Sequence, residues 1–370
     1  MKPDRSDDAA LTRIDAPARI KGRGAASNPE GRFESIARTR EDDGWYREDE
    51  PAPRPDTVVT EERARSIISR NDSPDIHFEQ SINPYRGCEH GCIYCYARPS
   101  HSYLDLSPGR DFETQIFYKP NAVELLRDEL AAPSYVVSPI ALGTNTDPYQ
   151  PVEKQLRITR GILELLLEHR HPLTIVTKGG LILRDLDLLE RLAADGLAAV
   201  MVSVTTLDDE LKRKLEPRTA GPNLRLKMIR ELAQHGVPTG VMAAPMIPGL
   251  NDHELEKILE QAAEAGARSA GYVLLRLPHE LKALFEEWLR EHYPGRAAHV
   301  LSLLKQMHGG SVYDSTFHAR QRGAGPFAAL LQARFDRARR AHGLDRPATL
   351  DSGSFVRPTP RSGQLDLWSR

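Results

Sequence analysis

Three cysteines lie within a stretch of eight residues. Their thiols and their spacing make them the strongest candidates in the chain for a metal-binding or catalytic role. Cys88, Cys92 and Cys95 have the spacing C-x3-C-x2-C, and the 370-residue sequence contains no other cysteine. A disulfide framework uses an even number of cysteines spread over the fold, so three thiols on one short loop favour a metal ion or a cluster. Because a fourth cysteine is absent, a four-iron cluster held here would leave one iron open to a small molecule.

A zinc ion is the alternative occupant of this loop. His90 or His101 would complete a Cys3His site, and zinc accepts sulfur and imidazole ligands in a tetrahedron. Structural zinc sites usually take their ligands as two pairs divided by a long spacer, whereas these cysteines form one triplet. We favour the cluster. The alternative function is a nucleic-acid-binding protein with a structural zinc site and no catalysis.

The composition is that of an ordinary folded domain. Apolar residues make up 40% of the chain, charged residues 28%, and the formal net charge is −2, so no global basic field indicates nucleic acid. No apolar run approaches the ~20 residues that span a bilayer, and the first residues lack the apolar centre of a secretory signal. Free thiols without an export signal predict a cytoplasmic location and no membrane partner.

From about residue 80 onward, strand-like runs alternate with amphipathic helical runs. One strand leads into the cysteines, and further strands are expected at 134–142, 173–177, 197–205, 237–244 and 269–275. Helices are expected at 156–169, 181–193, 223–235 and 251–265. This alternation predicts an α/β fold in which about six units form a parallel sheet with right-handed crossovers. A doubly wound open sheet is the runner-up, although no glycine-rich dinucleotide turn follows the first strand.

Composition divides the chain into four regions. Residues 1–70 are rich in charged residues, proline and glycine and predict a flexible N-terminal arm; 75–277 form the α/β core. Residues 278–345 predict a C-terminal helical extension, and 346–370 a flexible tail. Within the largely irregular arm, glycines alternate with arginines over 22–33, and this piece could cradle an anion.

The cysteine loop resembles the signature loop of the radical S-adenosylmethionine (SAM) superfamily. Residues 83–97 read Asn-Pro-Tyr-Arg-Gly-Cys-x-His-Gly-Cys-x-Tyr-Cys-Tyr-Ala, 146–153 read Thr-Asp-Pro-Tyr-Gln-Pro-x-Glu, and 244–250 read Ala-Pro-Met-Ile-Pro-Gly-Leu. This wording is similar to the spore photoproduct lyase-related branch, whose members are often described as DNA repair photolyase-like. The resemblance covers roughly residues 80 to 275 and implies a partial (βα)6 TIM-like barrel.

The resemblance implies a [4Fe–4S] cluster on the three cysteines, with SAM chelating the fourth iron through its amino and carboxylate groups. An electron from a reductant such as flavodoxin or ferredoxin would cleave SAM and release a 5′-deoxyadenosyl radical. This radical would abstract hydrogen from a substrate in a lyase-like or transferase reaction, and a nucleic-acid base is the candidate substrate.

One departure from the branch concerns the last step of the lyase reaction. The lyase returns hydrogen to its product through a cysteine outside the cluster loop, and this chain has none to spare. A tyrosine such as Tyr103, Tyr149 or Tyr313 would have to substitute, so reversal of a thymine dimer by that route is not assumed. No catalytic residue is assigned from the sequence.

Candidate SAM contacts lie where the expected strands end, since reactive groups of a parallel barrel gather there. The resemblance places Tyr94 near the adenine. Thr146 and Asp147 stand in a polar segment after the second strand, where the SAM ammonium would find acceptors, although the same residues suit a tight turn. Ser203 and Thr205 lie on one face of the fourth strand by alternation and suit the ribose hydroxyls.

Several cationic side chains are further candidates for contacts with SAM or the substrate. Arg218 suits the SAM carboxylate, because a guanidinium binds a carboxylate through two hydrogen bonds, unless it is only a surface arginine at a helix end. Lys178 and Arg276 stand at two other strand ends and face either the cavity or solvent. An arginine-rich stretch over 320–340 could track phosphates, although arginines on the outer face of a terminal helix are usually solvated.

Overall fold

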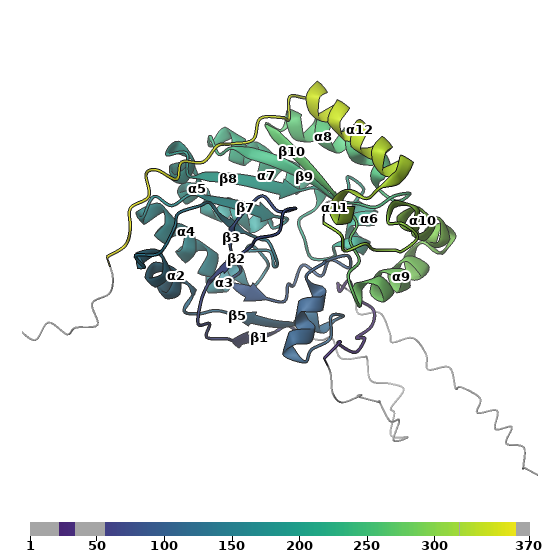
Figure 1. The fold of residues 1–370 in the computed structure, drawn as a ribbon, viewed down its shortest axis with the longest axis horizontal. Helices are drawn as coiled ribbons and strands as arrows, with labels where there is room; N and C mark the ends of the chain where they lie inside the picture. Colours follow the sequence, from purple (N-terminus) through teal and green to yellow (C-terminus); the bar gives the residue numbers. More distant parts are fainter. Residues whose placement is uncertain (1–21, 34–55, 318, 360–370) are drawn as a thin grey trace, which may run out of the picture.

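A seven-stranded sheet forms the centre of the computed structural model, which describes residues 22–33, 56–317 and 319–359. Its order is β10-β9-β8-β7-β6-β3-β2, and every neighbouring pair except β2–β3 is parallel. The strands are β2 (Ile68–Arg70), β3 (Gln80–Ile82), β6 (Ile140–Leu142), β7 (Leu173–Thr177), β8 (Ala198–Ser203), β9 (Thr239–Met246) and β10 (Ser269–Leu274). The sheet is curved (Figure 1), but it does not close into a complete barrel, because its two edge strands β10 and β2 are not paired with each other. The predicted α/β partial barrel is confirmed.

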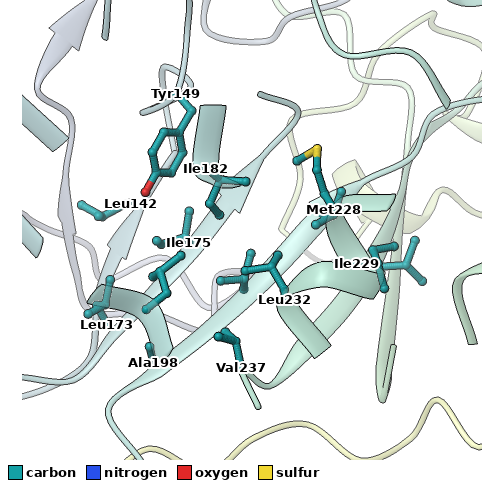
Figure 2. Packing of buried hydrophobic residues seen from close by; sticks show 14 of the residues in the cluster. Leu142, Tyr149, Leu173, Ile175, Ile182, Ala198, Met228, Ile229, Leu232 and Val237 are labelled. Atoms are coloured by element: carbon teal, nitrogen blue, oxygen red, sulfur yellow. The ribbon is translucent and has the colours of Figure 1, made fainter. Parts of the chain in front are cut away.

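Helices follow the parallel strands and cover the outer face of the sheet (Figure 1). They are α3 (Glu153–Leu156) and α4 (Ile158–Glu168) after β6, η2 (Gly180–Asp185) and α5 (Leu186–Ala194) after β7, α6 (Asp209–Leu215) and α7 (Pro222–Gln234) after β8, and η3 (Asp252–Glu254) and α8 (Leu255–Glu264) after β9. Met228 and Leu232 are one helical turn apart on α7, so both join Ile175 of β7 in the main core (Figure 2). In the ranges described, no helix is long and apolar enough to cross a membrane.

The connection from β3 to β6 is the longest crossover and carries the cysteines. It contains β4 (Tyr85–Arg86), the cysteine loop, η1 (Arg98–Leu104), α1 (Asp111–Thr114), β5 (Gln115–Tyr118) and α2 (Ala122–Ala131). β5 pairs with β4 and with β1 (Val58–Glu61), which makes a second, three-stranded sheet. The cysteine loop therefore starts from a strand that is paired at its base.

The C-terminal extension packs against the cysteine loop. It consists of α9 (Leu281–His292), α10 (Pro294–Met307), α11 (Ala319–Arg322) and α12 (Gly325–Ala341). Phe285 and Trp288 of α9 belong to one buried cluster with Cys92, Ile93 and Tyr94. The extension thus supplies the apolar backing of the cysteine loop.

Residues 22–33, here called the strap, lie across the cysteine loop. The backbone N–H groups of Gly24 and Ala25 each donate to the buried carboxylate of Glu113 at 2.9 Å. Glu113 also pairs with the fully buried Arg98, which donates to the Cys92 carbonyl at 2.8 Å. A Cβ on Gly24 would lie 1.9 Å from the carbonyl oxygen of Gly91, so only glycine allows this approach. The anion that the strap binds is a carboxylate of the same chain.

The predicted flexible arm and tail contain ordered segments. β1 and β2 fall within residues 1–70, where little apolar sequence is needed because edge strands are held by backbone hydrogen bonds. Residues 346–359 run past α5, α4 and α2 (Figure 1), with Phe355 packed 5.2 Å from His171 between ring centroids. The remainder of both predicted regions lies outside the described residues.

We expect Glu113→Gln to lower the free energy of unfolding by about 3–5 kcal/mol, because Arg98 would keep a buried charge without its counter-ion. The matched control is Glu286→Gln, which removes an i,i+4 pair with the exposed Arg290 and should cost less than about 1 kcal/mol. Urea unfolding measures both values. Equal small losses in the two variants would contradict a role for Glu113 in holding the strap.

Candidate functional site

The cysteine loop is a series of tight turns between β4 and η1. The amide N–H of Gly91 donates to the Cys88 carbonyl at 3.3 Å, and the N–H of Cys95 to the Cys92 carbonyl at 3.2 Å. All three thiols are free, and those of Cys88 and Cys92 are buried. Burial raises the pKa of the Cys92 thiol to about 12, with the Glu216 carboxylate adding to the effect. The residues fit a bound metal cluster, because iron supplies the positive charge that a buried thiolate needs.

The polar segment after β6 fastens the cysteine loop. The Asp147 carboxylate accepts the N–H of Lys178 at 2.7 Å and the Thr177 hydroxyl at 2.6 Å, and lies 3.3 Å from His90 Nδ1. Burial opposes ionisation of Asp147, but His90 and these donors outweigh it and lower its pKa to about 2. Gln150 forms a second contact between this segment and the cysteine loop, because its Oε1 accepts the N–H of Glu89 at 2.9 Å.

Asn83 and Thr146 tie the same segment to the end of β3. The side-chain oxygen of Asn83 accepts the N–H of Asn145 at 2.9 Å, and the Thr146 hydroxyl donates to the Tyr85 carbonyl at 3.2 Å. Thr146 and Asp147, predicted as SAM contacts, are thus both engaged in bonds within the protein. Their contact with SAM stays a prediction.

A buried carboxylate collects the hydroxyls predicted to meet the nucleoside part of SAM. Glu216 accepts the Tyr94 hydroxyl, the Thr205 hydroxyl at 2.7 Å, and a guanidinium N–H of Arg225. Burial disfavours the charged form of Glu216, but Arg225 and Lys178 outweigh it and lower its pKa to about 2. Tyr94 and Thr205 are therefore brought together, with 3.3 Å between their oxygens.

Ser203 and Arg218 are placed differently from these two. Ser203 is buried at the end of β8, where its carbonyl accepts a bond from Arg225 at 3.0 Å. Arg218 lies 3.1 Å from Glu89 Oε1, so its charge is already compensated by the cysteine loop. Contact of either residue with SAM remains a prediction.

Sequence reasoning missed Glu216 and Arg225 and gave Lys178 no assigned role. Lys178 follows β7, its ammonium lies 5.9 Å from the centroid of the Tyr94 ring, and its charge acts on both Cys92 and Cys95. Among the described residues its ammonium has no hydrogen-bond or ion-pair partner. The position of Lys178 at a strand end was the available signal, but nothing in the sequence linked Glu216 to Arg225.

The histidines of the zinc alternative have partners elsewhere. His90 bonds Asp147 as described, and His101 Nε2 lies 3.0 Å from the Gln115 carbonyl oxygen.

Some arginines of the C-terminal helices are paired with carboxylates. Arg320 pairs with Asp75 at 2.5 Å, and Arg334 pairs with Glu256 at 2.7 Å. These contacts join the extension to the core, so these two arginines have a structural role, and phosphate contact by the stretch remains a prediction.

Comparison with known proteins places this site in a family. Residues 82–262 match the Radical SAM superfamily. An uncharacterized protein of Mycobacterium tuberculosis is 42% identical over 219 residues, which cover 59% of this chain and 64% of the relative, less than two thirds of its length. A protein of Pseudomonas phage M6 named radical SAM Nα-GlyT isomerase is 25% identical over 193 residues, 51% of this chain and 38% of that one.

Solved structures agree on the fold. Spore photoproduct lyase complexed with dinucleoside spore photoproduct has a TM-score of 0.56 at 16% identity, covering 77% of this chain and 79% of that one. A mutant of that enzyme with bound AdoMet and dinucleoside spore photoproduct has a TM-score of 0.51 at 16% identity, with the same coverage. The predicted resemblance is confirmed. Residues 82–262 are therefore a radical SAM domain, in a chain whose fold is similar to that of spore photoproduct lyase.

Proposed function

We propose that this chain is an enzyme that cleaves SAM reductively at a [4Fe–4S] cluster and removes a hydrogen atom from its substrate. When bound, the cluster and SAM supply the electron and the 5′-deoxyadenosyl radical. The observation that carries the proposal is the isolated thiol triplet at the carboxyl ends of a parallel sheet, in a chain that has no fourth cysteine.

Cys88, Cys92 and Cys95 would hold three irons of the cluster. The neighbouring residues keep these thiols in place: Asp147 and Gln150 bond the loop from the β6 side, and the Glu113–Arg98 pair bonds it under the strap. The apolar residues of α9 back the loop and keep water away from it.

Lys178 would hold the SAM carboxylate. Its ammonium is the cation that lies over Tyr94 and acts on two of the thiols, whereas Arg218 is compensated by Glu89. The Tyr94–Thr205–Glu216 group fixes the wall along which the nucleoside would lie. Because these hydroxyls already bond Glu216, we assign them to positioning that wall.

A nucleic-acid base is the substrate class we propose, with flavodoxin or ferredoxin as the electron donor. The support is the spore photoproduct lyase structure complexed with a dinucleoside photoproduct, together with the phage relative named radical SAM Nα-GlyT isomerase. Since the chain has only the three cluster cysteines, the reaction would proceed without a cysteine that returns hydrogen.

Alanine at Cys88, Cys92 or Cys95 should abolish the cluster. We expect wild-type protein reconstituted without oxygen to be brown and to bind about four irons per chain, and each variant to lose this iron. Iron analysis and 5′-deoxyadenosine formation after reduction measure the effect, with Ser302→Ala on the exposed face of α10 as control. A colourless wild-type protein with about one zinc per chain would contradict the proposal and support the zinc alternative.

Lys178→Gln should weaken SAM binding by about tenfold or more, because the carboxylate would lose its cation, while Lys178→Arg should retain most of the affinity. Equilibrium dialysis of SAM with the reconstituted protein measures the dissociation constant. Lys227→Gln on the exposed face of α7 is the matched control. If Arg218→Gln weakens binding and Lys178→Gln does not, the carboxylate is held by Arg218 instead.

A further inference from the structure

A second cation stands at the mouth of the barrel without a counter-ion. Arg276 follows β10, and its guanidinium carbon lies 5.2 Å from the centroid of the Tyr96 ring. Its Nε atom is buried and has no hydrogen-bond partner among the described residues. Nor does any carboxylate of the described ranges pair with its charge.

Three other arginines near the cysteine loop are paired with glutamates. Arg98 pairs with Glu113, Arg225 with Glu216, and Arg218 with Glu89. A buried donor without a partner is costly, and proteins satisfy nearly all such groups. A guanidinium that has an unsatisfied N–H donor beside the expected cofactor site therefore indicates a ligand that accepts its hydrogen bonds.

The surroundings of Arg276 point to the substrate. Tyr96 directly follows Cys95, its side chain is 47% exposed, and its hydroxyl donates to the Thr144 carbonyl just after β6. The tyrosine thus reaches from the cysteine loop to the β6 side of the mouth, with its ring under the guanidinium of Arg276. Lys178 stacks on Tyr94, the tyrosine on the other side of Cys95, and is assigned to SAM.

We propose that Arg276 binds an oxyanion of the substrate, either a phosphate or a carboxylate, with the Tyr96 ring as the wall beside it. The inference rests on the proposed function and adds a specificity residue to the same site. A guanidinium offers paired N–H donors that match two oxygens of such a group, and its stacking on an aromatic ring fixes the plane of the donors. A planar base attached to a phosphate would use both the exposed ring and the cation.

The test compares binding of three small probes to the reconstituted protein by calorimetry. Thymidylyl-thymidine carries a phosphodiester, thymidine carries the base without charge, and glutarate carries carboxylates without a base. We expect Arg276→Gln to weaken thymidylyl-thymidine binding by about tenfold or more, Arg276→Lys to weaken it less, and thymidine binding to stay the same. Arg230→Gln on the exposed face of α7 is the matched control.

Glutarate separates the two sources of the oxyanion. If it binds more tightly than thymidylyl-thymidine and loses affinity in Arg276→Gln, the substrate group is a carboxylate. If the variant binds every probe as the wild type does, or the wild type binds no anionic probe below about 10 mM, the inference is overturned.

Two further readouts distinguish a ligand-binding arginine from a structural one and from a failure of the radical chemistry. Removal of an unpaired, partly buried charge should leave the melting temperature unchanged or raise it, whereas a structural arginine would lower it when lost. 5′-Deoxyadenosine formation by the wild-type protein without substrate tests the proposed function independently. If that product forms and Arg276→Gln binds all probes normally, only the inference about Arg276 fails.

Discussion

The buried carboxylate of Glu216 connects the parts of the chain that make up the site. It accepts bonds from Tyr94 in the cysteine loop, from Thr205 after β8, and from Arg225 of α7. A charge taken out of water is tolerated only when its partners surround it, and removal of one partner typically costs about 3–5 kcal/mol. The geometry beside the third cysteine therefore depends on segments more than a hundred residues apart.

The cysteine loop is held from two other sides by polar side chains. Asp147 and Gln150 bond it from the β6 segment, and the Glu113–Arg98 pair bonds it beneath the strap. Gln150 and Arg98 bond backbone groups of this loop, which has no regular structure, and Asp147 bonds its His90 side chain. Such a loop has many backbone groups to satisfy, and these ties satisfy them while leaving the thiols free.

The cations at the mouth of the barrel fall into two groups, according to whether a glutamate forms an ion pair with them. Arg98, Arg218 and Arg225 serve the frame, since each is compensated by a glutamate. Lys178 and Arg276 lie over the two tyrosines that flank Cys95, and within the described ranges neither forms an ion pair with a carboxylate, although the charge of Lys178 also acts on Glu216. The paired cations maintain the shape of the site, and we propose that the two without an ion pair bind ligands.

The sequence by itself determined the parallel α/β fold, the helical extension and the cysteine loop, because strand–helix alternation and thiol spacing are local patterns. It did not determine the docking of the strap on Glu113, the partner of Arg218, or the Glu216–Arg225 pair. Those contacts join residues whose proximity arises only when the crossovers bring strand ends together. Only the tertiary structure decided which polar residues of the conspicuous motifs serve the frame, because a carboxylate or guanidinium has the same sequence signature whether its partner is the protein or a ligand.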